Sequence, residues 1–214
     1  MTARHTIVAA AVWYKGLIPP MRFRFAILLV TACFTWTASA EDIAESAGSP
    51  PHQIDSISAS SVEAGFGPEG GAEALIVRTI TAAKVSIRLA AFAFSSPVIV
   101  DALLAAKRRG VDIKIVADRK HNVEEDEKGI GRRALGKLVE AGIRVRTNSE
   151  YRIHHDKFIV VDARHVQTGS YNYASSANRN SENVLVVWNA SALAAMYLAH
   201  WESRFSSGTE YSQK

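Results

Sequence analysis

One stretch near the C-terminal end of the sequence combines residue types that can cleave a phosphate ester. His155-Asp156-Lys157 is followed at Asp162 and, after six further residues, by Gly169-Ser170-Tyr171-Asn172. Written as a pattern, this is H-x-K-x4-D-x6-G-S-x-N. Because each residue type occupies roughly one position in twenty, six fixed positions at this spacing arise by chance in about one of several hundred thousand chains of this length. The pattern therefore indicates a site.

The side chains of this stretch match the needs of phosphodiester hydrolysis, which are a nucleophile, donors for the non-bridging oxygens and an acid for the leaving alkoxide. The imidazole of His155 can attack phosphorus and form a phosphohistidine that water then hydrolyses. Lys157 lies two residues further on, so it faces the same side of an extended strand and supplies a positive charge. Ser170 and Asn172, again two residues apart, supply neutral donors.

This pattern resembles the HKD motif of the phospholipase D superfamily, with no departure in spacing. Asn180-Ser181-Glu182-Asn183 is similar to the polar segment of the bacterial Nuc-type endonucleases in that superfamily, and the likeness runs from about Ala64 to the C-terminus. The resemblance implies a phospholipase D-like fold and a mechanism without metal or cofactor, in which one histidine is the nucleophile and another the general acid. Glu182 is a candidate to bind the imidazole N–H and fix its tautomer.

A mechanism with two histidines conflicts with a chain that has one copy of the motif and no internal repeat. The expected solution is an isologous homodimer in which the two sets of His155, Lys157, Ser170 and Asn172 face each other across the two-fold axis. The resemblance implies the same, because single-motif relatives pair in this way. We find no other His or Asp cluster with metal-ligand spacing in the sequence, so no metal site is expected.

Three residues of the motif region are expected to have supporting roles. Asp162 lies seven residues after His155, on the opposite face of a regular strand, so we expect it to be structural. Gly169 is expected to shape the turn that precedes Ser170. His154 faces away from His155, and we expect it to pack or to lie at the rim of the site.

Two tyrosines and two bases outside the catalytic set are candidates for contacts with a substrate: Tyr171, Tyr173, Arg119 and Lys120. The tyrosines can stack on nucleobases or pack in the core. The two cations, followed by His121, can line a nucleic-acid groove. The run Lys107–Arg109 either shares that groove or complements the C-terminus of a helix. Glu124–Glu127 is expected to be a solvated loop.

Hydrophobic periodicity predicts an α/β domain in which a mixed β-sheet is flanked by helices. Strands and helices alternate early in the domain, and strands cluster late. Pro97 marks a helix start and Gly110 a helix stop. The expected strands are 62–66, 85–94, 111–117, 143–146, 157–161, 166–168 and 184–188. The expected helices are 69–83, 97–109, 131–141 and 190–205, the last with Leu193, Met196, Tyr197 and Trp201 on one stripe.

The first 40 residues have the pattern of a secretory signal peptide. A basic opening at Met21–Arg24 precedes a nearly continuous apolar run from Phe25 to Trp36, and Ala38-Ser39-Ala40 suits signal peptidase. The run is too short for a comfortable membrane span. We therefore expect cleavage after Ala40, export to the periplasm or beyond, and no stable membrane insertion of the mature protein. Residues 1–20 are interpreted as an upstream extension, with Met21 as the start.

Cys33 leaves an alternative open, because Val30–Cys33 resembles a lipobox that would make the protein a membrane-anchored lipoprotein. It is the single cysteine of the chain, so cleavage after Ala40 would leave no thiol for a disulfide or a thiolate zinc site. Residues 41–60 are rich in Ser, Ala, Pro and acids and are expected to be a flexible linker. Residues 61–214 then form the catalytic domain.

Three functions fit these observations. The first is a nonspecific endonuclease that cuts DNA, and RNA as a further substrate, through backbone contacts. The second is a phospholipase D acting on lipid headgroups, although neither an amphipathic basic segment nor a second motif supports it. The third is a non-catalytic nucleic-acid-binding protein, which would not require a nucleophile. Residues 61–214 carry only a small excess of bases over acids, so charge favours a polyanionic substrate weakly. We rank the endonuclease first.

Overall fold

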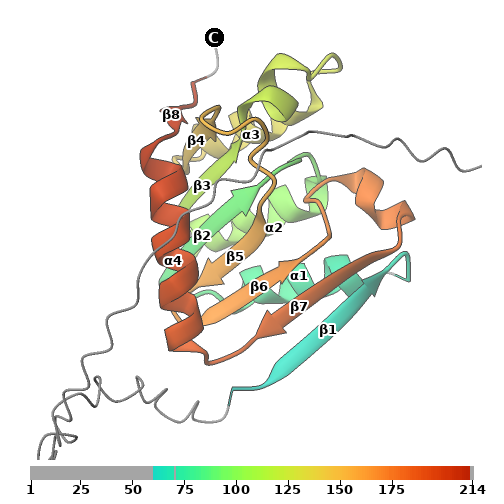
Figure 1. Ribbon diagram of the computed structural model, residues 1–214, viewed down its shortest axis with the longest axis vertical. Helices are drawn as coiled ribbons and strands as arrows, with labels where there is room; N and C mark the ends of the chain where they lie inside the picture. The colour runs from blue at the N-terminus through green and yellow to red at the C-terminus, as the bar shows by residue number, and fades with distance from the viewer. Residues whose placement is uncertain (1–59, 70, 213–214) are drawn as a thin grey trace, which may run out of the picture. The chain divides into compact units, whose positions relative to one another are not determined.

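The computed structural model describes residues 60–69 and 71–212. The predicted signal peptide (1–40) lies outside these residues, as does the predicted linker (41–60) apart from Ser60. The described part is built on one eight-stranded sheet, shown in Figure 1. Its strands are β1 (Val62–Gly67), β2 (Ser86–Ala91), β3 (Asp112–Asp118), β4 (Arg144–Asn148), β5 (Lys157–Val161), β6 (His165–Gly169), β7 (Glu182–Val187) and β8 (Thr209–Glu210).

The strands follow the order β1-β7-β6-β5-β2-β3-β4-β8 across the sheet. β2, β3 and β4 are parallel neighbours joined by helices, as parallel pairing requires. β5, β6, β7 and β1 pair in antiparallel fashion, and β5 also pairs antiparallel to β2. The predicted class, an α/β domain with a mixed sheet flanked by helices, is confirmed.

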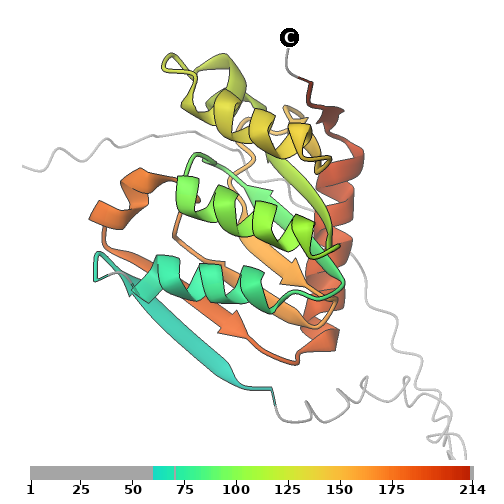
Figure 2. The same ribbon diagram turned by 180° about the vertical axis from the view of Figure 1, so that it is seen from behind.

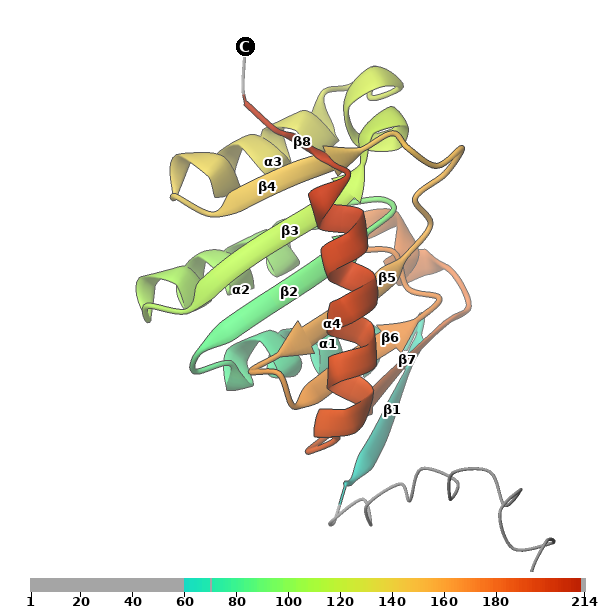
Figure 3. The ribbon, with the colours of Figure 1, turned by 60° about the vertical axis from the view of Figure 1, so that its left-hand side comes forward.

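Helices cover both faces of the sheet. They are α1 (Gly71–Ala82), α2 (Pro97–Arg108), α3 (Ile130–Glu140) and α4 (Ser191–Ser206), with a π-helical turn η2 (Lys120–Glu124) and a 3-10 turn η3 (Ser175–Arg179). Figure 2 shows α1, α2 and α3 together on one face, and Figure 3 shows α4 crossing the other. Helix α2 begins at Pro97, where the Ser96 hydroxyl accepts the Ile99 N–H at 3.4 Å and caps the first turn.

Each face has its own buried cluster. The larger cluster, with Leu75, Ile99 and Leu135, lies between α1–α3 and the sheet. The smaller one lies under α4, where the Trp201 indole donates to the backbone oxygen of Leu89 at 2.9 Å. The expected stripe on α4 is wrong for Met196, whose surface is 70% exposed. Helical spacing indicated that residue, but α4 packs only on the central strands and leaves its side uncovered.

Asp162 fixes the turn between β5 and β6 to the start of β2. Its φ angle is 52°, and its carboxylate accepts the backbone N–H groups of Lys84, Val85 and Ser86 at 2.9, 2.8 and 2.8 Å. Partial burial raises the pKa of this carboxyl, but the three amide donors lower it by more, so the pKa lies below its ordinary 3.8. Asp162 thus makes structural contacts within the motif.

We expect Asp162→Asn to lower the free energy of unfolding by about 2–4 kcal/mol, because a charged acceptor of three amides is lost. Urea unfolding followed by tryptophan fluorescence measures this. A lowered folded-state pKa stabilises above the unfolded value of 3.8 and loses that effect as pH falls through the folded value. The difference in the free energy of unfolding between wild type and variant should therefore persist at pH 5 and become smaller below pH 3.8. Asp101→Asn on exposed helix surface is the control, and an equal loss there would contradict the assignment.

Candidate active site

The candidate residues meet at one edge of the sheet. β5 runs antiparallel to β2, so Lys157, its first residue, pairs with Ala91, the last residue of β2. β6 ends at this edge with Gly169, and β7 begins there with Glu182. Three neighbouring strands thus bring Lys157, Ser170 and Glu182 together, although 25 positions of sequence separate the first from the last.

His155 and Lys157 lie on one side of the chain and share a neighbour, Phe92. The rings of Phe92 and His155 are 4.7 Å apart, and the Lys157 Nζ lies 5.3 Å from the Phe92 ring centre. The same Nζ donates to the backbone oxygen of His155 at 2.9 Å. Lys157 is buried, whereas His155 is exposed to an incoming ligand. The two-residue spacing therefore places the accessible imidazole of His155 beside the buried ammonium group of Lys157.

The surroundings of His155 favour its neutral form. Partial burial lowers the pKa of this imidazole below its ordinary 6.5, and the positive charge of Lys157 lowers it further. Burial likewise lowers the pKa of Lys157, although the carboxylates of Asp156 and Glu182 oppose that shift. A neutral imidazole has the lone pair that attack on phosphorus requires.

The lowered pKa of His155 predicts the pH dependence of the reaction. A nucleophilic imidazole must be unprotonated, so the acid limb of kcat/KM, which reports the free enzyme, should have its midpoint below pH 6.5. Lys157→Met removes one cause of the lowering and should move that limb of the residual activity to higher pH. Rates on a soluble phosphodiester between pH 4.5 and 8 test this. A wild-type midpoint above 6.5 would contradict the assignment.

Glu182 occupies a different position from the expected one. We expected its carboxylate to bind the His155 imidazole, but within the single chain it accepts the Ser170 hydroxyl and, at 3.0 Å, the Asn180 amide. The reason is the strand order, since β6 lies between β5 and β7. A carboxylate at the start of β7 therefore meets the end of β6 first. The Ser170 oxygen in turn accepts the Asn183 N–H at 3.0 Å.

Gly169 allows β6 to approach β7 closely at this point. A Cβ atom at Gly169 would lie 2.2 Å from the backbone oxygen of Asn183, too close for any side chain. That oxygen also accepts the Ser170 N–H at 3.1 Å. The glycine thus positions Ser170 through strand pairing, in addition to ending the strand.

Asn172 lies on a segment that crosses the edge of the sheet. The backbone of Tyr173 pairs with Phe94, beyond the end of β2, and its oxygen accepts the Ser95 N–H at 2.8 Å. Because β5 lies between β6 and β2, this segment passes over the beginning of β5, where Lys157 is found. Among the described residues, none satisfies the buried side-chain oxygen of Asn172. This buried oxygen thus has no hydrogen-bond partner within the described part of the chain.

Tyr171 and Tyr173 pack in the core, so stacking on nucleobases is the wrong interpretation. Tyr171 is 1% exposed and its hydroxyl donates to Asn178, while Tyr173 is fully buried and donates to Gln167 at 2.7 Å. Burial raises the pKa of both hydroxyls. Alternation along the segment explains this, because Ser170 and Asn172 take the outward positions.

The basic groups predicted for a groove lie in two places. Arg119 and Lys120 follow β3 at the same edge as the site and form exposed ion pairs with Glu124 at 2.8 Å and Glu125 at 3.2 Å. Glu124 itself belongs to η2, where we expected a loop, whereas residues 125–127 lie outside any helix or strand, as predicted. Helix α2 runs away from this edge, so Lys107–Arg109 lies at the opposite one, and Arg109 donates to backbone oxygens at the end of α1. The groove interpretation is wrong for Lys107–Arg109.

We expected His154 either to pack or to lie at the rim of the site, and it packs beneath the site. It is buried, and its backbone N–H donates to Asp118 Oδ2 at 2.8 Å. Its Nδ1 lies 3.6 Å from Asp156 Oδ2, and that oxygen is 3.0 Å from His200 Nε2. Burial lowers the pKa of the His154 imidazole, although the carboxylates of Asp156 and Asp118 oppose that shift. His200, on α4, was not found by sequence reasoning because no motif surrounds it.

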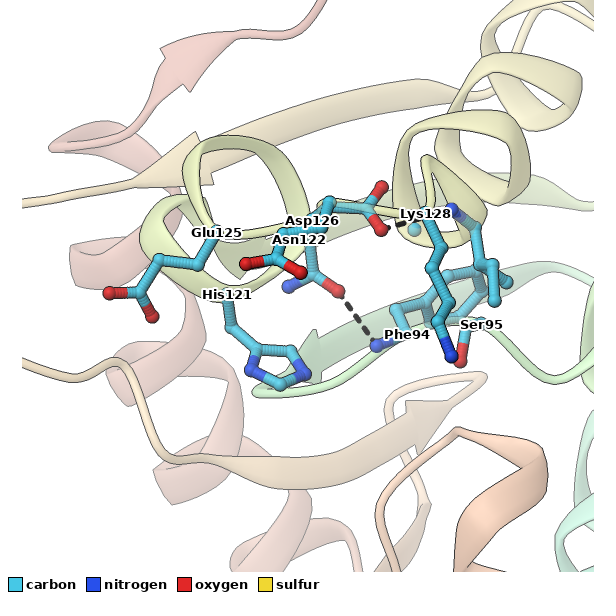
Figure 4. Close-up of a pocket in the computed structure, with 10 residues that line it drawn as sticks. Phe94, Ser95, His121, Asn122, Glu125, Asp126 and Lys128 are labelled. Carbon is cyan, nitrogen blue, oxygen red and sulfur yellow. Dashed lines mark hydrogen bonds between the residues drawn. The ribbon is translucent and has the colours of Figure 1, made fainter.

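Three hollows adjoin this edge. One of about 480 Å³ and one of about 290 Å³ both reach His155. Figure 4 shows the third, of about 300 Å³, with His121 at its rim. In that view the Asn122 side-chain oxygen accepts the Phe94 N–H at 2.8 Å. The side-chain amide of Asn122 also donates to the backbone oxygens of Phe92 and Asp118. Asn122 thereby fixes the segment that carries Phe92 beneath His155.

Among residues 60–69 and 71–212, no group of three or more His, Cys, Asp or Glu side chains is arranged to hold a metal ion. Over the same residues, no helix combines the length and apolarity that a membrane crossing needs.

Comparisons with known proteins agree with this arrangement. Residues 76–205 match the family model described as cardiolipin synthase, PLD-like domain. A phospholipase D from Rickettsia bellii is 36% identical over 154 residues, 72% of this chain and 73% of that protein. Human mitochondrial cardiolipin hydrolase is 37% identical over 112 residues, 52% of this chain and 42% of that protein.

A solved structure extends the likeness to three dimensions. Nuc from Salmonella typhimurium, described as a phospholipase D family member, has a TM-score of 0.69 and 42% sequence identity, and the match covers 72% of this chain and 100% of that one. The shared fold, the HKD pattern and the family model all indicate the same superfamily. The chain therefore belongs to the phospholipase D superfamily and is a hydrolase that acts on phosphodiester bonds.

Proposed function

We propose that this hydrolase is a metal-independent, nonspecific endonuclease that cuts DNA, and RNA as a further substrate, in a site formed by two copies of the chain. The observation that carries the chemistry is the exposed imidazole of His155 beside the buried ammonium of Lys157, whose Nζ donates to the His155 backbone oxygen at 2.9 Å. Together they offer a nucleophile and a charge for the non-bridging oxygens without a metal ion.

The reaction proceeds in two displacements. In the first, a nitrogen of the neutral His155 imidazole bonds to phosphorus, the bond to the leaving oxygen breaks, and the partner subunit's His155, which enters the step as an imidazolium, protonates the alkoxide. In the second, that now neutral histidine takes a proton from water as the water oxygen bonds to phosphorus and the phosphorus–nitrogen bond to His155 breaks, which releases a phosphomonoester. Lys157 and the amide of Asn172 stabilise the charge on the phosphoryl oxygens in both steps.

An exposed apolar surface beside the site supports the pairing of two copies. Phe66 and Val62 on β1 are each 59% exposed, and Leu185 on β7 is 37% exposed. They share the sheet face opposite α1, on strands that α4 does not cover. Phe66 pairs with Asn183, whose N–H binds Ser170, so the surface continues into the catalytic edge. A second copy related by a two-fold axis would cover this surface and bring a second His155 to the first.

The choice of DNA over phospholipid rests on likeness and charge. Nuc is 42% identical to this chain, and the match covers the whole of Nuc and 72% of this chain. The segment Asn180–Asn183 also resembles the Nuc-type endonucleases. Exposed cations flank the edge at Arg152 and Arg179, where a polyanionic backbone would pass. A phospholipid is the second candidate substrate, because relatives are named phospholipase D and cardiolipin hydrolase. We further propose action in the periplasm or outside the cell, on the sequence pattern of residues 1–40.

Purified full-length protein incubated with supercoiled plasmid in excess EDTA tests this function, with phosphatidylcholine and cardiolipin vesicles in parallel. We expect nicked and then linear DNA with intact lipid. Intact DNA beside phosphatidic acid or a released headgroup would replace the proposal with the phospholipase. Loss of DNA cutting in EDTA, restored by added magnesium, would contradict the metal-independent mechanism.

A further inference from the structure

Helix α4 brings a histidine to the catalytic edge that the two-displacement mechanism does not use. His200 Nε2 lies 3.0 Å from Asp156 Oδ2, and Asp156 stands between His155 and Lys157 in the chain. The same oxygen faces His154, whose backbone N–H is bound by Asp118 on β3. The His200 ring is therefore oriented by its contact with Asp156, directly beside the catalytic residues.

His200 forms part of the wall between two hollows. Both are lined by His155, Asp156 and His200. The larger, of about 480 Å³, is completed by Lys157, Phe158, Thr168, Gly169, Met196 and Tyr197. The smaller, of about 290 Å³, adds Tyr151, Ile153, His154 and Arg204. A phosphodiester carries two ester groups on one phosphorus, so with phosphorus at His155 the two groups extend in different directions, and two hollows are available for them.

The larger hollow has the composition of a site for a flat heterocycle. Phe158, Met196 and Tyr197 give it apolar walls, and the rings of Phe158 and Tyr197 meet edge to face at 4.9 Å. His200 and Thr168 add polar groups at its margin. If Nε2–H is donated to Asp156, Nδ1 of His200 is an acceptor for a substrate N–H. The volume lies within the range usual for ligand pockets, and aromatic and thioether groups pack well on a base.

We propose that this hollow is the binding subsite for the nucleoside next to the scissile phosphate, with its base against Tyr197 and Met196 and its edge bound by His200. The inference rests on the proposed nuclease function and deepens it. His200 is then a substrate-binding residue rather than part of the nucleophilic machinery. Asp156 positions it.

An oligothymidylate with a single abasic tetrahydrofuran residue tests the subsite. Removing one base should slow cleavage at one of the two phosphates that flank it by about tenfold, relative to the same phosphate in the intact strand. His200→Ala and Met196→Ser should each reduce that discrimination to about threefold or less. Glu202→Ala, exposed on the other side of α4, should leave it unchanged. Met196 is 70% exposed, so its variant will fold even where the His200 variant does not.

The outcomes separate this inference from the function on which it rests. Equal cleavage beside the abasic residue and beside thymidine in the wild type would overturn the subsite while DNA cutting stands. Variants that slow every phosphate equally would also overturn it, since His200 would then act on the chemistry or the fold. If no strand is cut but vesicle lipid is hydrolysed, the nuclease proposal fails and the subsite fails with it.

Discussion

Replacing His155 with asparagine is expected to lower the rate of DNA cleavage by at least about 10⁴-fold, because the covalent step has no other nucleophile. The side chain is exposed and packs against the half-buried ring of Phe92, so the variant should fold and unfold like the wild type. First-order rates of plasmid nicking with enzyme in excess measure the loss.

His165→Asn is the matched control for this substitution. His165 lies at the opposite edge of the sheet, where its Nδ1 accepts the Asn189 N–H at 3.0 Å. An asparagine oxygen can take over that contact, so activity should stay close to that of the wild type. More than about 1% of wild-type activity in His155→Asn would contradict its role as nucleophile.

Lys157→Met is expected to lower kcat/KM by about 10²- to 10³-fold, the usual cost of removing one preorganised group that stabilises transition-state charge. Methionine keeps the apolar stem in a position that is 8% exposed, so the change isolates the ammonium group. Steady-state kinetics on a soluble phosphodiester, with thermal unfolding alongside, measure the effect.

Lys114→Met serves as the control for the second prediction, since Lys114 lies on β3, paired with Arg88 and Arg144 and away from the catalytic edge. It should change kcat/KM by less than about twofold. A Lys157→Met enzyme within tenfold of the wild type would mean that other groups neutralise the phosphoryl oxygens.

Much of the fold could be predicted from local pattern. The buried run 157–161 has the bounds of β5, and Pro97 marks the start of α2 as its fixed φ angle leads one to expect. The predicted strand 111–117 and the predicted helix 131–141 also agree with the bounds of β3 and α3 to within one or two residues. These elements are specified by periodicity and by terminal residues, which act within a few positions of sequence.

Other features depend on which strands become neighbours. The partner of Glu182 follows from β6 lying between β5 and β7, which no local pattern specifies. Phe92 and His200 reach the site from elements that carry no motif. The burial of Tyr171 is different, because the alternation that turns Ser170 and Asn172 outward already turns Tyr171 inward. The burial of Tyr171 could therefore have been predicted from alternation alone. We instead interpreted an aromatic residue beside the motif as a stacking residue.

A purified heterodimer tests most directly the claim that two copies form one site. Wild-type and His155→Asn chains with different tags are produced together and isolated by both tags in turn. We predict that the heterodimer nicks DNA as slowly as the His155→Asn homodimer, because the nucleophile and the general acid come from different copies. A heterodimer with about half of the wild-type rate, or a wild-type protein that is active as a monomer, would contradict the shared site.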